Sequence, residues 1–131
     1  MIEYRQNLPL DPEDVVRVYE SSGLTRPTQD IARIGHMFAG SNLVISAWSD
    51  AVLVGVCRAL TDYSYCCYLA DLAVDRNFQK QGIGRQMIQR VRTAIGEEVS
   101  LMLLSAPGAM SYYPKLGFAT IENGFVVKRA R

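Results

Sequence analysis

Residues 69–84, LADLAVDRNFQKQGIG, run from an apolar segment directly into a turn that contains Gly82 and Gly84. The next residues, 85–95, place apolar side chains at helical spacing. A strand that feeds a glycine turn at the start of a helix can hold phosphate, because unpaired N–H groups and the positive end of the helix dipole meet there. The stretch therefore predicts a strand, a phosphate-binding turn and a helix in succession.

The candidate phosphate-binding turn comprises Gln79, Lys80, Gln81, Gly82, Ile83, Gly84 and Arg85. Its glycines let an anion approach the backbone, and its cationic side chains can add charge-assisted contacts. A glycine turn alone is weak evidence, because glycine also punctuates strands and helices without binding anything. The turn lacks the GxxxxGK[ST] pattern of P-loops and the third glycine of GxGxxG, where Met87 stands.

Composition limits the classes of protein that this chain can represent. Its 131 residues are 49% hydrophobic and 21% charged, which is typical of one globular domain over residues 1–131. A net charge of +1 gives no global attraction to nucleic acid or membrane. The sequence shows no apolar run of membrane length and no signal peptide at its start. We therefore expect a cytoplasmic protein with no nucleic-acid or membrane partner.

Cysteine and histidine usage gives no support for a metal site. The three cysteines, Cys57, Cys66 and Cys67, form no CxxC motif, and the chain contains one histidine. A zinc site built from cysteine and histidine normally needs four such ligands at regular spacing. We expect reduced thiols and no metal.

The order of periodic segments predicts one mixed α/β domain. Asp11 and Pro12 give a typical helix start, and the Asn123-Gly124 pair favours a tight hairpin turn. The full order is β-α-α-β-β-β-α-β-α-β-β. Strands are expected over residues 2–5, 43–48, 52–59, 66–74, 100–104, 118–121 and 125–128, and helices over residues 12–22, 27–39, 85–95 and 109–116.

A second motif identifies a family resemblance. Residues 112–118, YYPKLGF, follow the glycine turn after one predicted helix and one predicted strand. The pair of motifs resembles the GNAT superfamily of acetyl-CoA-dependent N-acetyltransferases. Its [RQ]xxGx[GA] loop matches Gln79, Gly82 and Gly84 after an LAV strand, and its FYxKLGF ending matches residues 112–118. The resemblance is specific over residues 69–118.

The resemblance implies how the cofactor-like substrate is held. The fourth and fifth strands of a GNAT-like acyl-CoA N-acyltransferase fold splay apart to admit acetyl-CoA. The backbone of the Leu72-Ala73-Val74 segment would bind the pantetheine arm as an added strand. The N–H groups from Gln79 to Arg85 would hold the pyrophosphate. The family also makes a homodimer reasonable.

Tyr113 is the expected catalytic acid, since the resemblance places the thioester beside it. A phenol can donate a proton to the departing thiolate, and a packing role is its structural alternative. Asp71 is the candidate general base, with an ordered water as the alternative and amine orientation as a third role. Positioning the two substrates together would supply most of the acceleration.

The function expected from these residues is acetyl transfer from acetyl-CoA to a primary amine. Several acceptors remain open: small metabolites, arylalkylamines, polyamines, amino sugars and protein amines. A looser similarity to a small GNAT subgroup that acts on arylalkylamines favours arylalkylamines slightly. The alternatives are a non-catalytic acyl-CoA sensor of GNAT fold and a nucleotide-binding regulator that uses the glycine turn.

Overall fold

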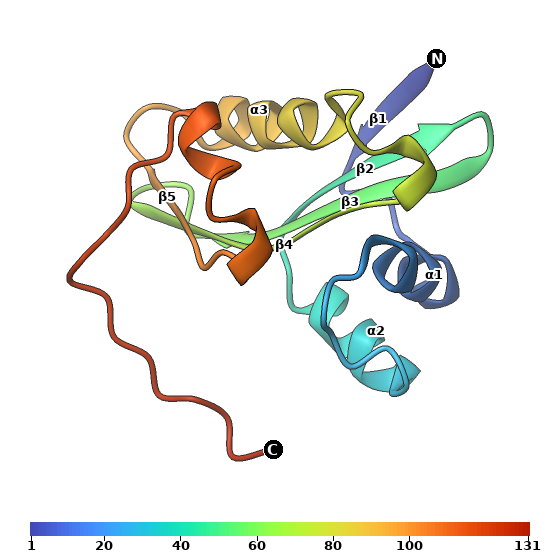
Figure 1. Cartoon of the computed structure of the whole chain (residues 1–131), viewed down its shortest axis with the longest axis horizontal. Helices are drawn as coiled ribbons and strands as arrows, with labels where there is room; N and C mark the ends of the chain where they lie inside the picture. The colour runs from blue at the N-terminus through green and yellow to red at the C-terminus, as the bar shows by residue number, and fades with distance from the viewer.

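The computed structural model describes residues 1–131 as a five-stranded mixed sheet covered by helices on both faces. Figure 1 shows α3 on one face and the pair α1 and α2 on the other. The elements are β1 (Ile2–Gln6), α1 (Pro12–Ser22), α2 (Ile31–Ala39), β2 (Leu43–Ser49), β3 (Val52–Thr61), β4 (Cys66–Val74), η1 (Arg76–Phe78), α3 (Ile83–Ile95), β5 (Ser100–Leu103), η2 (Pro107–Ala109) and η3 (Tyr113–Leu116). None of the helices combines the length and hydrophobicity needed to cross a bilayer.

The strands lie in chain order, β1-β2-β3-β4-β5. Neighbours from β1 to β4 pair antiparallel, whereas β5 pairs parallel to β4. The parallel pair requires a crossover, and α3 provides it. The predicted mixed α/β class is therefore confirmed.

Local sequence signals set the helix starts. The Asp11 side chain accepts a hydrogen bond from the Glu13 N–H at 2.9 Å, as predicted, and Gly23 ends α1 in the left-handed conformation. The second helix begins at Ile31, four residues later than predicted from Pro27. Its cap is Asp30, whose side chain accepts from the Arg33 N–H at 3.1 Å. The residues before this cap form turns instead.

Two apolar cores flank the sheet. The larger core joins α3 to the sheet through Met87, Ile88 and Val91. The smaller core joins α1 and α2 to the opposite face, with Val18 and Ile34 fully buried in it. Because helices pack on both faces, the central strands are apolar over most of their length.

The sheet opens between β4 and β5. Their pairing begins at Cys66 with Ser100 and ends at Leu69 with Leu103, so residues 70–74 have no partner on that side. The register between β3 and β4 also shifts here, leaving Ala70 as an extra residue. Such a bulge bends and twists a strand. The predicted divergence of the fourth and fifth strands is therefore present.

The C-terminal part differs from the prediction. The helix predicted over residues 109–116 is replaced by two short helices, η2, which ends at Ala109, and η3, which begins at Tyr113 and contains Pro114. The predicted strands over residues 118–121 and 125–128 do not form, and this segment extends away from the sheet in Figure 1. The Phe125 and Val127 side chains are almost fully exposed. The segment does not pair with the free edge of β5, and a two-stranded hairpin that is not joined to a sheet is only marginally stable.

Candidate active site

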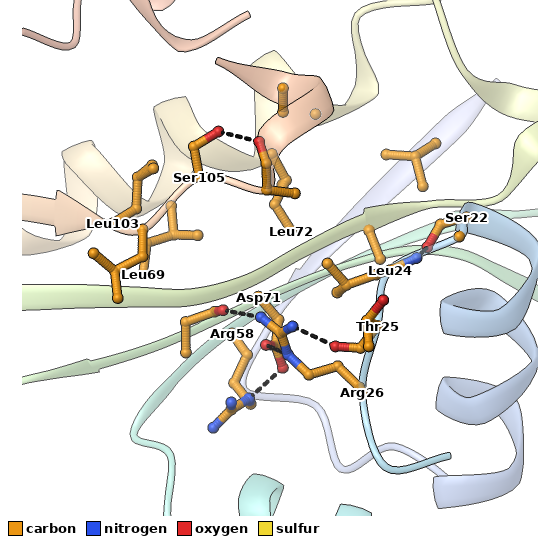
Figure 2. Close-up of a pocket in the computed structure, with 18 of the residues that line it drawn as sticks. Ser22, Leu24, Thr25, Arg26, Arg58, Leu69, Asp71, Leu72, Leu103 and Ser105 are labelled. Carbon is orange, nitrogen blue, oxygen red and sulfur yellow. Dashed lines mark hydrogen bonds and ion pairs between the residues drawn. The ribbon is translucent and has the colours of Figure 1, made fainter. Parts of the chain in front are cut away.

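The opening between β4 and β5 leads into a cavity of about 1280 Å³. Its wall combines the second half of β4, the start of α3, the segment after β5 and the loop between α1 and α2. Figure 2 shows Leu72 and Ser105 on one side of β4, and Arg26, Arg58 and Asp71 on the other. The cavity thus brings together segments from both ends of the chain.

The start of α3 presents free backbone donors to this cavity. Gly82 precedes the helix with φ at +85°, a conformation that favours glycine. The N–H groups from Gly82 to Arg85 donate to no other backbone group of the chain, and no side chain caps the helix. The helix begins at Ile83, two residues earlier than predicted. The geometry is therefore that of an anion-binding helix terminus with a glycine turn.

The predicted cofactor-binding residues divide into two groups. Gln79, Lys80, Gly82, Gly84 and Arg85 line the cavity, as do Ile83, Leu72, Ala73 and Val74, whereas the exposed Gln81 does not. Among the strand residues, the Ala73 side chain is buried in the smaller core. Its contribution to a ligand is therefore confined to its backbone.

One contact bears on the pantetheine prediction. The Gln79 side chain donates a hydrogen bond to the Val74 carbonyl at 2.9 Å. That carbonyl thus already accepts one hydrogen bond within the chain, and a ligand strand that used it would share its second lone pair or replace the amide. The role of Val74 in binding the pantetheine arm stays a prediction. The hydrogen bond between Gln79 and Val74 ties the turn to the end of β4 at the edge of the cavity.

Two tyrosines line the cavity that opens between β4 and β5. Tyr112 and Tyr113 both line the cavity, and their rings pack edge to face at 5.2 Å between centroids. The Tyr112 hydroxyl lies against Gly84, where a Cβ would come within 2.8 Å of it. The ring of Tyr113 packs on Phe118 at 5.6 Å. Packing therefore fixes the position of both phenols.

The electrostatic surroundings of the two phenols differ. Burial raises the pKa of Tyr113 to about 12, with further contributions from Tyr112 and Cys57, while Arg26 acts in the lowering direction. Burial also raises the pKa of Tyr112, and there the opposing cation is Arg85. The pKa of Tyr113 thus responds to the Arg26 guanidinium beside β4, and the pKa of Tyr112 responds to the Arg85 guanidinium at the start of α3. Both stay protonated near neutral pH.

Asp71, the candidate base, lies in a cluster that the sequence does not reveal. Its carboxylate accepts hydrogen bonds from Arg26 Nε at 2.5 Å, Arg58 Nε at 2.6 Å and the Tyr19 hydroxyl at 2.7 Å. The Asp71 side chain is fully buried. Its neighbours come from α1, the following loop and β3, which are 52, 45 and 13 residues away in the chain.

This cluster makes Asp71 a poor proton acceptor. Burial alone would raise the pKa of its carboxyl, but the hydrogen bond and charge of Arg58, the hydrogen bond of Tyr19 and the charge of Arg26 bring it below its ordinary value. A carboxylate stabilised in its charged form has little tendency to take a proton. The geometry instead favours a role in holding the two guanidinium groups in place.

Arg58 and Arg26 are the cavity residues that the sequence interpretation missed. Arg58 stands alone as a charge in the apolar strand VLVGVCRAL, which is a usable signal for a buried, paired residue. Arg26 lies in a loop and carries no such signal. Its Nη2 donates to the Ala70 carbonyl at 2.8 Å, so it also holds the β4 bulge.

The chain is similar in sequence to known acetyltransferases. Residues 15–131 match the family model described as an acetyltransferase (GNAT) domain. An uncharacterized N-acetyltransferase, ycf52, from Gracilaria tenuistipitata var. liui is 28% identical over 115 residues, which cover 85% of this chain and 63% of that protein. The chain therefore spans less than two thirds of the length of this relative.

Solved structures share the fold over almost the whole chain. A Staphylococcus aureus protein of unknown function aligns with a TM-score of 0.80 and 22% identity, covering 98% of this chain and 100% of that one. An aminoglycoside N-acetyltransferase solved in complex with CoA aligns with a TM-score of 0.73 and 18% identity, covering 100% of this chain and 96% of that one. At such identities these likenesses establish the fold.

Proposed function

The chain belongs to the GNAT family of acetyltransferases, and on that basis we propose that it transfers acetyl from acetyl-CoA to a primary amine while both are bound. The observation that carries this proposal is that a single cavity holds the free N–H groups of α3, the open edge of β4 and the Tyr113 phenol. A pyrophosphate binder, a slot for an extended arm and a proton-bearing group are the parts that such a transfer needs.

We assign pyrophosphate binding to the N–H groups from Gly82 to Arg85. They are unpaired donors at the positive end of a 13-residue helix, which favours an anion. Lys80 and Arg85 are exposed beside them and can add charge-assisted contacts. The pantetheine arm is assigned to the unpaired stretch of β4 over residues 70–74.

In the proposed reaction the neutral amine attacks the thioester carbonyl, and the carbon–sulfur bond breaks with release of the CoA thiolate. A phenol with a pKa of about 12 is a far weaker acid than a thiol, whose pKa is about 8.5. Tyr113 therefore stabilises the leaving sulfur by donating a hydrogen bond, and solvent restores the proton of the thiol. Holding both reactants in one cavity supplies the larger share of the acceleration.

The proton lost by the amine is assigned to water. Asp71 is engaged by three donors and has a lowered pKa, so it is unsuited to the task. The two guanidinium groups beside it favour the uncharged form of a nearby amine, because a like charge lowers the pKa of an ammonium. The site thus promotes the nucleophilic form of the acceptor without a dedicated base.

Replacing Tyr113 with phenylalanine is expected to lower kcat about 10²-fold, the scale of one lost hydrogen-bond donor to a developing negative charge, with little change in the KM for acetyl-CoA. Tyr65→Phe is the matched control, since Tyr65 is exposed and lies outside the cavity. Steady-state release of free thiol measures both variants. Undiminished turnover in Tyr113→Phe would remove the phenol from the mechanism.

The pH dependence has a predicted shape. Because the pKa of Tyr113 is about 12, the phenol keeps its proton up to about pH 11. Activity should therefore rise with pH as the amine loses its proton, and then stay level to about pH 10. A fall in kcat with a midpoint near pH 8 would show that another acid is required.

A thiol-release screen of acetyl-CoA with a panel of amines tests the proposed function. Turnover of at least one amine supports an enzyme. Binding of acetyl-CoA without turnover of any amine would instead favour the acyl-CoA sensor, and preferential binding of ATP or NAD would favour a nucleotide regulator. Thermal shift with these three ligands separates the binding outcomes.

A further inference from the structure

The cavity wall on the α1 and α2 side of β4 carries an excess of positive charge. Asp71 is the single acidic side chain that lines the cavity, and it is already paired with both Arg26 and Arg58. Figure 2 shows the carboxylate between these two guanidinium groups. One negative charge therefore faces two positive charges, and the surplus is not neutralised within the chain.

The two guanidinium groups are held in fixed orientations. Arg26 donates through Nε to Asp71, through Nη1 to the Thr25 carbonyl and through Nη2 to the Ala70 carbonyl. Arg58 donates through Nε to Asp71 and through Nη1 to the Ser41 hydroxyl, and its guanidinium lies 5.8 Å from the centre of the Phe38 ring. Rigid guanidinium groups lose little entropy when they bind an anion.

Arg58 retains a free donor. Its Nη2 donates no hydrogen bond to the chain, and the Arg58 side chain, which lines the cavity, is 11% exposed. Arg33 adds a free cation from α2, because it is exposed, lines the cavity and forms no ion pair, and Arg129 and Arg131 of the C-terminal segment line the same cavity. Arg58 on β3 and Arg33 on α2 thus offer unused donors to the same cavity.

The same region is poorly suited to a polycationic acceptor. Polyamines and amino sugars need free carboxylates, and the one carboxylate here is consumed by the arginines. The part of the wall formed by α2 and the loop before it also includes the apolar side chains of Leu24, Pro27 and Met37. Donors of this kind match the geometry of a carboxylate, which guanidinium binds through paired hydrogen bonds.

We propose that the acceptor is a small amine that also carries a carboxylate, which Arg58 and Arg33 bind while Arg26 and Asp71 hold Arg58 in position. This inference rests on the proposed acetyl transfer and names its substrate class. The arginines act as specificity residues: they anchor the acid group and leave the amine free to reach the thioester.

Matched amine pairs test the proposal. Lysine against cadaverine, and phenylalanine against phenethylamine, differ by one carboxylate. The carboxylate-bearing member of each pair should have a kcat/KM about ten-fold higher or more, the scale of one charge-assisted hydrogen bond. Arg33→Gln should raise the KM for that member about ten-fold and leave its kcat and the partner amine unchanged.

Arg76→Gln is the matched control variant. Arg76 is also exposed but lies on η1 outside the cavity, so the substitution removes the same charge without touching the site. Its KM for both members should equal that of the parent protein. A parallel loss in Arg76→Gln would assign the effect to net charge and overturn the local site.

The outcomes separate this inference from the proposed function. Equal or better turnover of the decarboxylated amines overturns the inference while acetyl transfer stands. Turnover of no amine contradicts the proposed function, and a second measurement then still tests the site. In it, 3-phenylpropionate should shift the NMR signals of the Arg26 and Arg58 Nε–H groups, whereas 3-phenylpropylamine should not. Absence of a shift with the carboxylate overturns the inference.

Discussion

Replacing Asp71 with alanine is expected to lower the free energy of unfolding by about 3–5 kcal/mol, the range seen when one partner of a buried ion pair is removed. The variant leaves the guanidinium groups of Arg26 and Arg58 facing one another without a carboxylate, and it removes the acceptor of the Tyr19 hydroxyl. Such a loss is a large fraction of the stability of a typical domain. Urea denaturation measures it.

Asp14→Ala is the control for this prediction. Asp14 is half exposed and lies 3.9 Å from Arg17 on the surface of α1, so its pair should contribute about 0–1 kcal/mol. If Asp71→Ala loses no more stability than Asp14→Ala, the buried cluster is not a stabilising element. Asp71→Asn keeps the shape and removes the charge, which separates the ion pairs from the packing.

The same cluster predicts the direction of the pH dependence of stability. The folded-state pKa of Asp71 lies below its ordinary value of about 3.9, so the unfolded chain binds the proton more readily. The stabilisation is therefore complete above about pH 4–5 and is lost as the pH falls through the folded-state pKa. Asp71→Asn should flatten this acid limb in denaturation experiments.

Gly82→Val is expected to abolish the stabilisation of the protein by acetyl-CoA. Gly82 has φ at +85°, where a β-branched residue costs about 1–2 kcal/mol or more and the turn must rearrange. The rearrangement would disturb the N–H groups that we assign to the pyrophosphate. At a ligand concentration of 100 times Kd, the parent protein should gain about 2.7 kcal/mol, which thermal shift detects readily.

Gly96→Val is a control from the other end of the same helix. Gly96 has φ at +80° and, like Gly82, has open space where a Cβ would lie. Both variants should lose stability through backbone strain, but only Gly82→Val should lose the response to acetyl-CoA. A preserved response in Gly82→Val would place the ligand elsewhere.

The parts of this structure that the sequence predicts well are those fixed by neighbouring residues. The Asp11 cap, the Gly23 stop and the Gly82 turn each depend on side chains or backbone angles within a few positions. The order of strands up to β5 follows from short apolar segments and turns, and the family resemblance places the divergence of β4 from β5.

The environment of Asp71 depends on contacts that no local pattern encodes. Its partners Tyr19 and Arg26 come from α1 and a loop, and they meet Asp71 only after both helices pack on the sheet. A lone carboxylate in an apolar strand is equally compatible with a base and with an ion-paired anchor. The C-terminal segment is the second feature that the sequence predicted wrongly. Its local strand propensity does not decide whether it pairs with the free edge of β5, and in the structure it does not.

NMR titration with acetyl-CoA tests the central claim most directly, because it reports on individual backbone amides of this 14.6 kDa chain. We expect saturable shifts for the amides of Gly82, Ile83, Gly84 and Arg85, together with slower hydrogen exchange at these positions and along residues 70–74 of β4. Saturable binding that leaves these amides unchanged would contradict the assignment of the α3 terminus and the open β4 edge as the acetyl-CoA site.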